Sequence, residues 1–360
     1  MHKMKDLELL TKLSEVYGIS GHEKAVKHIM KEEFLKYVSE ENIKYDKLGS
    51  ISAKYGNGGV RFAIAGHMDE IGMIVTKITE QGFLKFQTIG GWWSQVLSSQ
   101  TMKVVTREGR AYTGVIGSIP PHILPPDALK SPVDIDSLYI DLGVNSKEDV
   151  EKMGIKVGDM ICPDTKVEVM ANGDFLLGKA WDNRIGCAIV LKVLELLKND
   201  EEECKNTVIG MGTVQEEVGC RGAQTVANIE EFDVGFGLDV TIAKDVPGTD
   251  GANGMGKGPT ILLYDSGLIG HAGLRDYALE IAKKYDIPVQ VDYLKRGATD
   301  ASKLSMAHSG AIAMSLCIPS RYIHSHSSMI SYKDYENASL LIYHIIKDMD
   351  VETFKKIAYE

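Results

Sequence analysis

A β-rich segment interrupts an otherwise alternating α/β sequence, and this interruption constrains the fold more than any other feature of the chain. Before it, two segments carry apolar side chains at helical spacing and two have the composition of short strands: residues 5–16, 23–38, 51–54 and 60–65. From about residue 167 onward, strands and helices alternate again. Because such alternation builds a mostly parallel sheet covered on both faces, we predict one α/β domain made of residues 1–70 plus 167–360.

The interrupting segment, residues 71–166, contains short β-type runs separated by Gly, Pro and Ser. The runs lie at residues 73–78, 83–89, 102–106, 112–116 and 138–142. A single short helical pattern occurs near residues 147–153. Short strands at regular spacing with turn residues between them are typical of a small barrel or sandwich. We therefore predict that a small β-barrel domain is inserted into the α/β domain.

The second half of the α/β domain contains the most hydrophobic run of the chain, residues 207–214. Such a run is expected of a strand that is buried on both faces. The same reasoning predicts further strands at residues 233–238, 261–264, 289–293 and 311–316. Helices are predicted at residues 183–197, 222–228, 272–285, 301–308 and 335–349. The expected fold is a mixed, mostly parallel sheet flanked by helices.

Composition excludes several classes of protein. The formal net charge is −10, which argues against a nucleic-acid partner because such proteins carry basic patches. No apolar run approaches the ~20 residues that span a bilayer, and the first residues show no secretion signal, so we expect a cytoplasmic protein without a membrane partner. The five cysteines are odd in number and form no Cys-x-x-Cys pair. Ligands for a metal would therefore be His and carboxylates.

Ligand-type residues occur in five short stretches next to predicted strands or helices. They are His67 and Asp69, Asp182, Glu216 and Glu217, Asp239, and His324 and His326. In open α/β sheets, ligands bind just beyond the carboxyl ends of the strands. Each stretch alone also has an ordinary explanation, such as a helix cap, a polar turn or a solvated charge. Two adjacent carboxylates can reach one site only if the chain leaves strand geometry, which the nearby Gly219 permits.

Together these residues favour a metal site that hydrolyses its substrate. Nitrogen and oxygen ligands without thiolate suit zinc, cobalt or manganese. A bridging Asp, with one His and one carboxylate for each ion, would hold two divalent ions. The remaining glutamate could act as the general base. The residues alone do not assign these roles between Glu216 and Glu217.

The same stretches resemble the co-catalytic metallo-aminopeptidases that form tetrahedral particles, a family that includes glutamyl and deblocking aminopeptidases and proteins labelled endoglucanase M. Seven stretches carry the resemblance in order along the whole chain: residues 66–72 (GHMDEIG), 181–184 (WDNR), 216–223 (EEVG with RGA), 239–241 (DVT), 256–259 (GKGP), 298–301 (ATDA) and 321–325 (RYIHS). Any one of them would be weak evidence. Their shared order and spacing make the resemblance specific, and it implies a zinc-peptidase type of α/β fold.

The resemblance also implies a role for each site residue. The implied metal ligands are His67, Asp182, Glu217, Asp239 and His324, with Asp182 bridging two ions. Glu216 would be the general base and Asp69 would orient His67. His324 occupies the motif position, although His326 is an alternative two residues away.

The implied activity is removal of N-terminal residues from peptides, with residues 71–166 mediating dimerisation and dimers building a homo-dodecamer. Another dinuclear hydrolase, such as an N-acyl amino-acid deacylase, is the alternative. A glycoside hydrolase is less favoured because it needs two carboxylates but no pair of metal ions.

Overall fold

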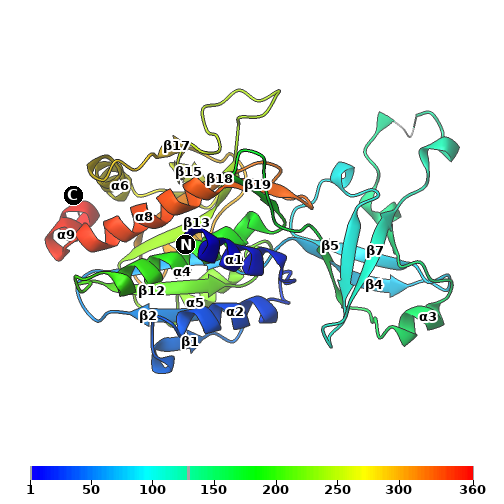
Figure 1. The fold of residues 1–360 in the computed structure, drawn as a ribbon, viewed down its shortest axis with the longest axis horizontal. Coiled ribbons are helices and arrows are strands. Elements are labelled where there is room, and N and C mark those ends of the chain that lie inside the picture. The colour runs from blue at the N-terminus through cyan, green and yellow to red at the C-terminus, as the bar shows by residue number, and fades with distance from the viewer. Residues whose placement is uncertain (1, 128–129, 360) are drawn as a thin grey trace.

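A single large sheet organises the α/β part of the molecule. The computed structural model describes residues 2–127 and 130–359. The sheet has eight strands in the order β1–β2–β12–β3–β13–β18–β14–β17 (Figure 1). Their bounds are β1 Ile43–Tyr45, β2 Ile51–Tyr55, β3 Arg61–His67, β12 Thr207–Thr213, β13 Val234–Ile242, β14 Thr260–Leu262, β17 Gln290–Asp292 and β18 Ile312–Ser320. The neighbouring strands β12, β3, β13 and β18 are parallel, so their carboxyl ends meet at one edge.

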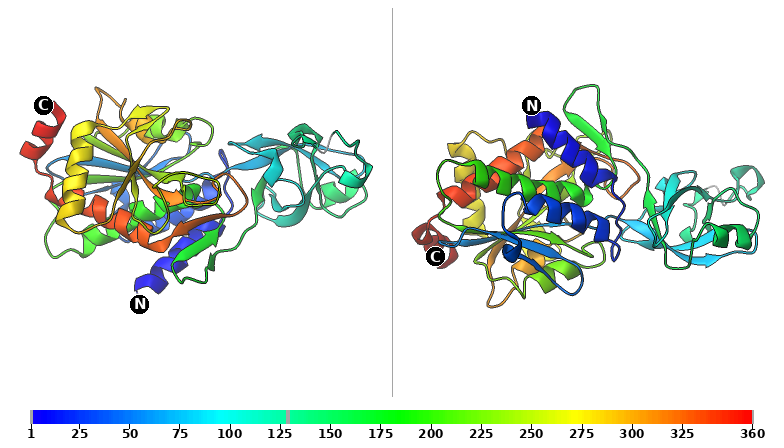
Figure 2. Two further views of the ribbon diagram at one scale, coloured as in Figure 1. Left: turned by 90° about the horizontal axis from the view of Figure 1, so that it is seen from above. Right: turned by 60° about the horizontal axis from the view of Figure 1, so that its bottom comes forward.

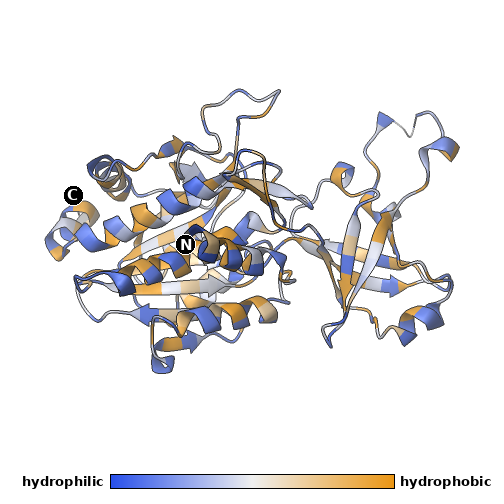
Figure 3. Ribbon diagram, in the orientation of Figure 1, coloured by the Kyte–Doolittle hydropathy of each residue, from blue (hydrophilic) through white to orange (hydrophobic). Residues whose placement is uncertain are grey.

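Helices cover both faces of this sheet. Side chains along each central strand point alternately to the two faces, so each face carries an apolar core that helices cover. Phe62 and Ile64 of β3 belong to the larger core, whereas Ala63 and Ala65 belong to the smaller one. The larger core is closed by α1 His2–Glu15, α2 Lys24–Phe34, α4 Trp181–Asn199, α6 Ala272–Lys284 and α8 Tyr332–Asp348. The smaller core is closed by α5 Arg221–Val226 and α7 Ala301–Leu304. Figure 3 shows the apolar residues concentrated on the central strands and the inner helix faces.

A closed barrel projects from one end of the α/β body, and α9 (Val351–Tyr359) lies at the opposite end (Figures 1 and 2). The barrel order is β4–β5–β8–β7–β6–β9. The bounds of its elements are β4 Gly72–Ile78, β5 Leu84–Ile89, β6 Thr101–Val105, β7 Ala111–Gly117, β8 Tyr139–Asp141, α3 Lys147–Lys152 and β9 Met160–Pro163. Residues such as Met73, Leu84 and Ile161 form a core separate from those of the sheet. The predicted fold class, an α/β sheet with an inserted barrel, is therefore confirmed.

The structure differs from the sequence-based expectation mainly at strand ends and in very short strands. Strand β13 continues past Leu238 to Ile242, and β18 continues past Leu316 to Ser320, because the two strands remain paired along this length. The unexpected elements are β1, β9, α9, the sheet of β10 Glu168–Val169, β11 Phe175–Gly178 and β19 Ser328–Ser331, and the hairpin of β15 Tyr264–Asp265 and β16 Leu268–Ile269. Strands of two to four residues are too short to display a periodic pattern. Within the described residues, no helix is both long and apolar enough to cross a bilayer.

A buried ion cluster fixes the loop after β3 against the first helices. Lys179 Nζ lies 2.6 and 2.7 Å from the two carboxylate oxygens of Glu70, and all but about 1% of both side chains is buried. The Arg184 guanidinium lies 3.3 Å from the same carboxylate and donates to the backbone oxygens of Leu13, Met68 and Gly18. The cluster therefore holds α1, the segment after β3 and the start of α4 in one arrangement.

Replacing Lys179 by Met is expected to lower the free energy of unfolding by about 3 kcal/mol, because it leaves the buried Glu70 carboxylate without its closest partner. Urea titration followed by circular dichroism measures the change. Lys166→Met is the control, since this lysine pairs with Glu15 while its side chain stays 62% exposed, and such pairs contribute about 1 kcal/mol or less. Equal effects of the two substitutions would contradict a stabilising role of the buried cluster.

Candidate functional site

The ligand-type residues gather at the edge where the parallel strands end. His67 is the last residue of β3, two positions beyond the predicted strand end, and Asp239 lies inside β13 rather than after it. Glu216 and Glu217 follow β12, His324 follows β18, and Asp182 lies in the first turn of α4. This is the position where open α/β sheets bind their ligands.

Asp182 stands between two histidines. Its Oδ1 lies 3.1 Å from His67 Nε2, and its Oδ2 lies 3.3 Å from His324 Nε2. The backbone of Asp182 is not helical (φ −81°, ψ 102°), so the first turn of α4 is broken here. A Cβ at Gly66 would collide with the backbone of Gly186, which shows how closely α4 approaches β3. This close approach brings the Asp182 carboxylate to the end of the sheet.

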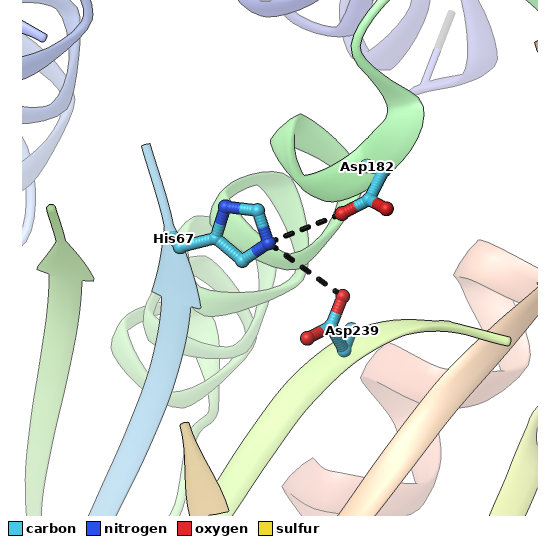
Figure 4. Close-up of side chains that lie close together, drawn as sticks. All are labelled: His67, Asp182 and Asp239. Carbon is cyan, nitrogen blue, oxygen red and sulfur yellow. Dashed lines mark ion pairs between the residues drawn. The ribbon is translucent and has the colours of Figure 1, made fainter. Parts of the chain in front are cut away.

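Two groups of three potential ligands share this carboxylate. In the first, His67 Nε2 lies 3.1 Å from Asp182 and 3.8 Å from Asp239 Oδ1 (Figure 4). In the second, His324 Nε2 lies 3.3 Å from Asp182 and 3.4 Å from Glu217 Oε2. The structure thus brings together all five residues predicted as metal ligands.

The two groups fit divalent cations. Tetrahedral zinc with bonds of about 2.0–2.2 Å separates its ligand atoms by roughly 3.3–3.6 Å, close to the separations of 3.1–3.8 Å found here. Glu217 Oε1 is buried and has no hydrogen-bond partner in the part of the chain that the structure describes. A bound cation would supply the partner that such a buried oxygen otherwise lacks.

The site concentrates negative charge away from water. Burial, reinforced by neighbouring carboxylates, raises the pKa of Glu216, Glu217 and Asp239 well above the usual range. Burial opposes protonation of His67, yet the carboxylates around it, with Glu216 and Asp182 foremost, raise its pKa well above its ordinary value. Cations placed among these groups would offset the repulsion between the carboxylates.

Glu216 lies beside the two groups and belongs to neither. Strand β12 ends at Thr213, and the chain leaves strand geometry at Gln215 (φ +56°). The two adjacent glutamates can therefore both face the site, as expected from the sequence only for a chain that leaves strand geometry. Glu216 Oε2 lies 3.6 Å from His67 Nε2, and its Oε1 accepts a hydrogen bond from the Cys220 thiol at 3.1 Å. A carboxylate next to a metal position, but outside its ligand set, is placed to exchange a proton with a substrate or water.

Asp69 contacts His67 chiefly through its backbone. His67 Nδ1 lies 3.0 Å from the carbonyl oxygen of Asp69 and 3.4 Å from its carboxylate Oδ1. The carboxylate accepts hydrogen bonds from Ser20 Oγ at 2.5 Å and from the backbone N–H groups of Glu216 and Glu217 at 3.0 and 3.2 Å. Asp69 therefore holds the backbone of both glutamates as well as facing the inner nitrogen of His67.

His326, the alternative to His324, lies outside both ligand groups. It is 5% exposed, and burial lowers its pKa to about 4. Its ring is 5.3 Å from the Trp92 ring, and its Nε2 has no hydrogen-bond partner among the described residues. The geometry therefore places His324, and not His326, next to Asp182 and Glu217.

Sequence reasoning assigned no role to Asp300, which lies next to Glu216. Asp300 is 3% exposed, its Oδ2 accepts a hydrogen bond from Thr213 Oγ1 at 2.5 Å, and its carboxylate groups with Glu216 and Cys220. Its position before α7 suggests an ordinary helix cap, but its side chain makes no capping hydrogen bond. In the sequence, Asp300 is marked only by its place in residues 298–301 (ATDA), one of the stretches that carry the family resemblance.

A cavity of about 940 Å³ opens in front of Asp182, Glu216 and Glu217. Apolar side chains form much of its wall, and they include Trp93, Ile242, Val246, Leu294 and Ile323. Two arginines also line it: Arg296, which is exposed, and Arg321, which pairs with Asp245. The cavity is large enough for the side chain of a substrate residue together with the backbone that follows it.

Known proteins resemble this chain over nearly its whole length. The chain is 40% identical over 340 residues to FrvX of Escherichia coli K12, which is named as an aminopeptidase, and the match covers 94% of each chain. The TET aminopeptidase of the marine sediment archaeon Thaumarchaeota archaeon SCGC AB-539-E09 has a TM-score of 0.95 and 42% identity, covering 99% of this chain and 100% of the other.

A third relative, the TET1 peptidase of Pyrococcus horikoshii, is described as assembling into a tetrahedron or a large octahedral shell. It is 31% identical with a TM-score of 0.85, covering 96% of this chain and 100% of the other. The family model described as M42 glutamyl aminopeptidase matches residues 49–341. The predicted family and enzyme class are thus confirmed: the chain belongs to the M42 glutamyl aminopeptidase family and is a peptide hydrolase that removes N-terminal residues.

Proposed function

We propose that this enzyme works with two divalent metal ions and that Glu216 is its general base. The observation that carries the proposal is the position of Asp182, whose two oxygens face two different histidines. Each histidine is accompanied by one further carboxylate, Asp239 or Glu217. A shared carboxylate with one histidine and one further carboxylate on each side is a donor set that would suit two divalent ions.

In this proposal His67 and Asp239 would hold one ion, Glu217 and His324 would hold the other, and Asp182 would contribute an oxygen to each. Asp69 orients His67 and fixes the backbone of the two glutamates. The donor set of nitrogen and oxygen atoms suits zinc or cobalt, and manganese is also compatible. When bound, the ions would polarise the scissile carbonyl and lower the pKa of the attacking water.

The residues of the chain then bind the substrate, transfer a proton and position the general base. The cavity in front of Glu216 holds the N-terminal residue of the peptide, and its apolar wall excludes water from that side chain. Glu216 accepts a proton from the attacking water and delivers it to the leaving amine. The Cys220 thiol and the backbone contacts to Asp69 keep the Glu216 carboxylate at its place beside His67.

Removal of metal is expected to abolish activity. After dialysis against EDTA, hydrolysis of aminoacyl-p-nitroanilides should fall at least about 100-fold, because ion-dependent stabilisation amounts to several kcal/mol. Activity should return when zinc, cobalt or manganese is restored. A panel with Glu, Asp, Leu and Lys at the N-terminus would identify the preferred residue. Full activity after verified metal removal would overturn the metal mechanism.

The same assay separates the alternative reactions. An N-acyl amino-acid deacylase would cleave acetylated amino acids, whereas an aminopeptidase needs a free α-amino group. We expect peptides with a free N-terminus to be cleaved and their N-acetylated forms to be resistant. A glycoside hydrolase would cleave oligosaccharides and would not require the pair of ions.

For the assembly, we propose that residues 71–166 form the dimerisation domain and that dimers build a homo-dodecamer. Support comes from the tetrahedral assembly of the Pyrococcus horikoshii relative and from exposed apolar side chains near the barrel, with Ile119 54% and Ile123 74% exposed.

We also propose a cytoplasmic location. The five cysteines are buried free thiols, which suits the reducing environment of the cytoplasm.

Light scattering tests the proposed assembly. Twelve chains of 39.5 kDa would give a particle of about 474 kDa. Ile123→Lys further tests whether the exposed segment around Ile123 forms the contact between chains. A mass near 39.5 kDa for the unmodified protein would contradict both the dimer and the dodecamer.

A further inference from the structure

The barrel reaches into the candidate metal site through the segment that follows β5. His324 Nδ1 lies 2.9 Å from the backbone carbonyl oxygen of Gly91. Because a carbonyl oxygen only accepts hydrogen bonds, this contact places the proton of the imidazole on Nδ1. In the neutral imidazole, the form that binds a metal ion, the lone pair is then on Nε2, the atom that faces Asp182 and Glu217.

The two histidines of the site are held very differently. His67 ends a central strand and its side chain is 1% exposed, whereas the side chain of His324 is 38% exposed. His324 lies in the connection between β18 and β19 and has a left-handed backbone (φ +59°), as does Tyr322 (φ +64°). Such conformations cost about 1–3 kcal/mol each in a non-glycine residue and persist only where surrounding contacts fix them.

Trp92 supplies such contacts from the barrel side. Its indole Nε1 donates a hydrogen bond to the carbonyl oxygen of Gly72, the first residue of β4, at 3.1 Å. Its ring packs against the ring of His326, with the centroids 5.3 Å apart. Trp92 therefore joins the start of the barrel to the connection that carries His324, next to the Gly91 carbonyl.

Glu217, the other ligand unique to the second group, also faces this segment. A Cβ at Gly90, which has φ +78°, would lie 3.2 Å from Glu217 Oε2 and would collide with Ile71. By contrast, the two ligands unique to the first group, His67 and Asp239, belong to β3 and β13 of the central sheet. The barrel segment thus packs against one half of the site.

We propose that residues 90–92 of the barrel are a positioning element for the second metal position, the one formed by Asp182, Glu217 and His324. The inference rests on the proposed two-metal function. The Gly91 carbonyl fixes the orientation of His324, and Trp92 fixes the segment that carries this carbonyl. Loss of a partner that hydrogen-bonds the non-coordinating nitrogen of a metal-binding histidine typically weakens metal affinity about 10–100-fold. The first metal position does not depend on this segment.

Calorimetric titration of the metal-free full-length enzyme with Zn²⁺, repeated with Co²⁺, tests the proposal. The unmodified protein should bind two ions per chain. In Trp92→Ala one affinity should fall about 10–100-fold, while the other stays within about twofold. Trp92→Phe keeps an aromatic ring but lacks the indole N–H, so it should weaken the same ion by a smaller factor. This variant carries the test if Trp92→Ala does not fold, as judged by thermal unfolding.

Trp93→Ala is the matched control, because Trp93 is 59% exposed and has neither of the Trp92 contacts described above. Both affinities should be unchanged in this variant. If both Trp92 variants bind two ions as tightly as the unmodified protein, or lose both affinities equally, the positioning role is refuted. Binding of a single ion by the unmodified protein would instead refute the two-metal function itself.

Discussion

Replacing Glu216 by Gln is expected to lower kcat on aminoacyl-p-nitroanilides by about 10³–10⁴-fold, the upper part of the range for loss of a general base. Gln has nearly the same shape as Glu but cannot accept the proton of the attacking water. Glu216 lies outside both ligand groups, so the variant should still bind two ions per chain. Steady-state kinetics and metal analysis on the same preparation measure both effects.

The exposed Glu202, whose side chain is 89% accessible, provides the control for this change. Glu202→Gln should leave turnover within about twofold, since surface substitutions away from special features have small effects. Near-normal turnover in Glu216→Gln would remove Glu216 from its proposed role. Loss of metal together with activity would instead indicate that Glu216 is itself a ligand.

Replacing Asp182 by Asn has the second-largest expected effect. The carboxylate offers one oxygen to each histidine group, and an amide offers a single, uncharged oxygen. We expect both ions to be weakened and turnover to fall at least about 10³-fold, equivalent to roughly 4 kcal/mol of transition-state stabilisation. Metal content after gel filtration and kcat at a fixed metal concentration are the readouts.

His324→Gln is the comparison for Asp182→Asn. His324 belongs to one ligand group only, so this variant should lose one ion and keep the other. If Asp182→Asn and His324→Gln each lose the same single ion, Asp182 does not bridge. If Asp182→Asn retains two tightly bound ions, the proposed ligand set is wrong.

The central sheet could be predicted well because its signals are local and strong. The apolar run at residues 207–214 indicates a doubly buried strand, and β12 spans most of it. His67 and Glu216 could be placed near strand ends for the same reason. The strand carrying Asp239 was predicted too short, because its continuation depends on pairing with β18 and not on local composition.

Interactions between distant segments could not be predicted. The three-stranded sheet of β10, β11 and β19 and the hairpin of β15 and β16 consist of strands with at most four residues each. The contact between Gly91 and His324 joins residues 233 positions apart and involves a backbone oxygen, which leaves no trace in side-chain patterns. Asp300 received no role from the sequence, because its hydrogen bond with Thr213 joins residues 87 positions apart.

The distinction between Glu216 and Glu217 required more than the residue pattern. Both are glutamates at the end of the same strand, and the resemblance to a family supplied their roles. In the structure their positions differ: Glu217 groups with Asp182 and His324, whereas Glu216 lies near His67 but outside both groups that contain Asp182. Asp69 contacts both through their backbone N–H groups.

The most direct test of the two-metal mechanism is a crystal structure of the cobalt- or zinc-loaded enzyme with anomalous scattering. Two peaks about 3.5–4 Å apart are expected on either side of the Asp182 carboxylate. One should lie beside His67 and Asp239, and the other beside Glu217 and His324. A single peak at full metal occupancy, or a pair of peaks that does not flank Asp182, would contradict the account.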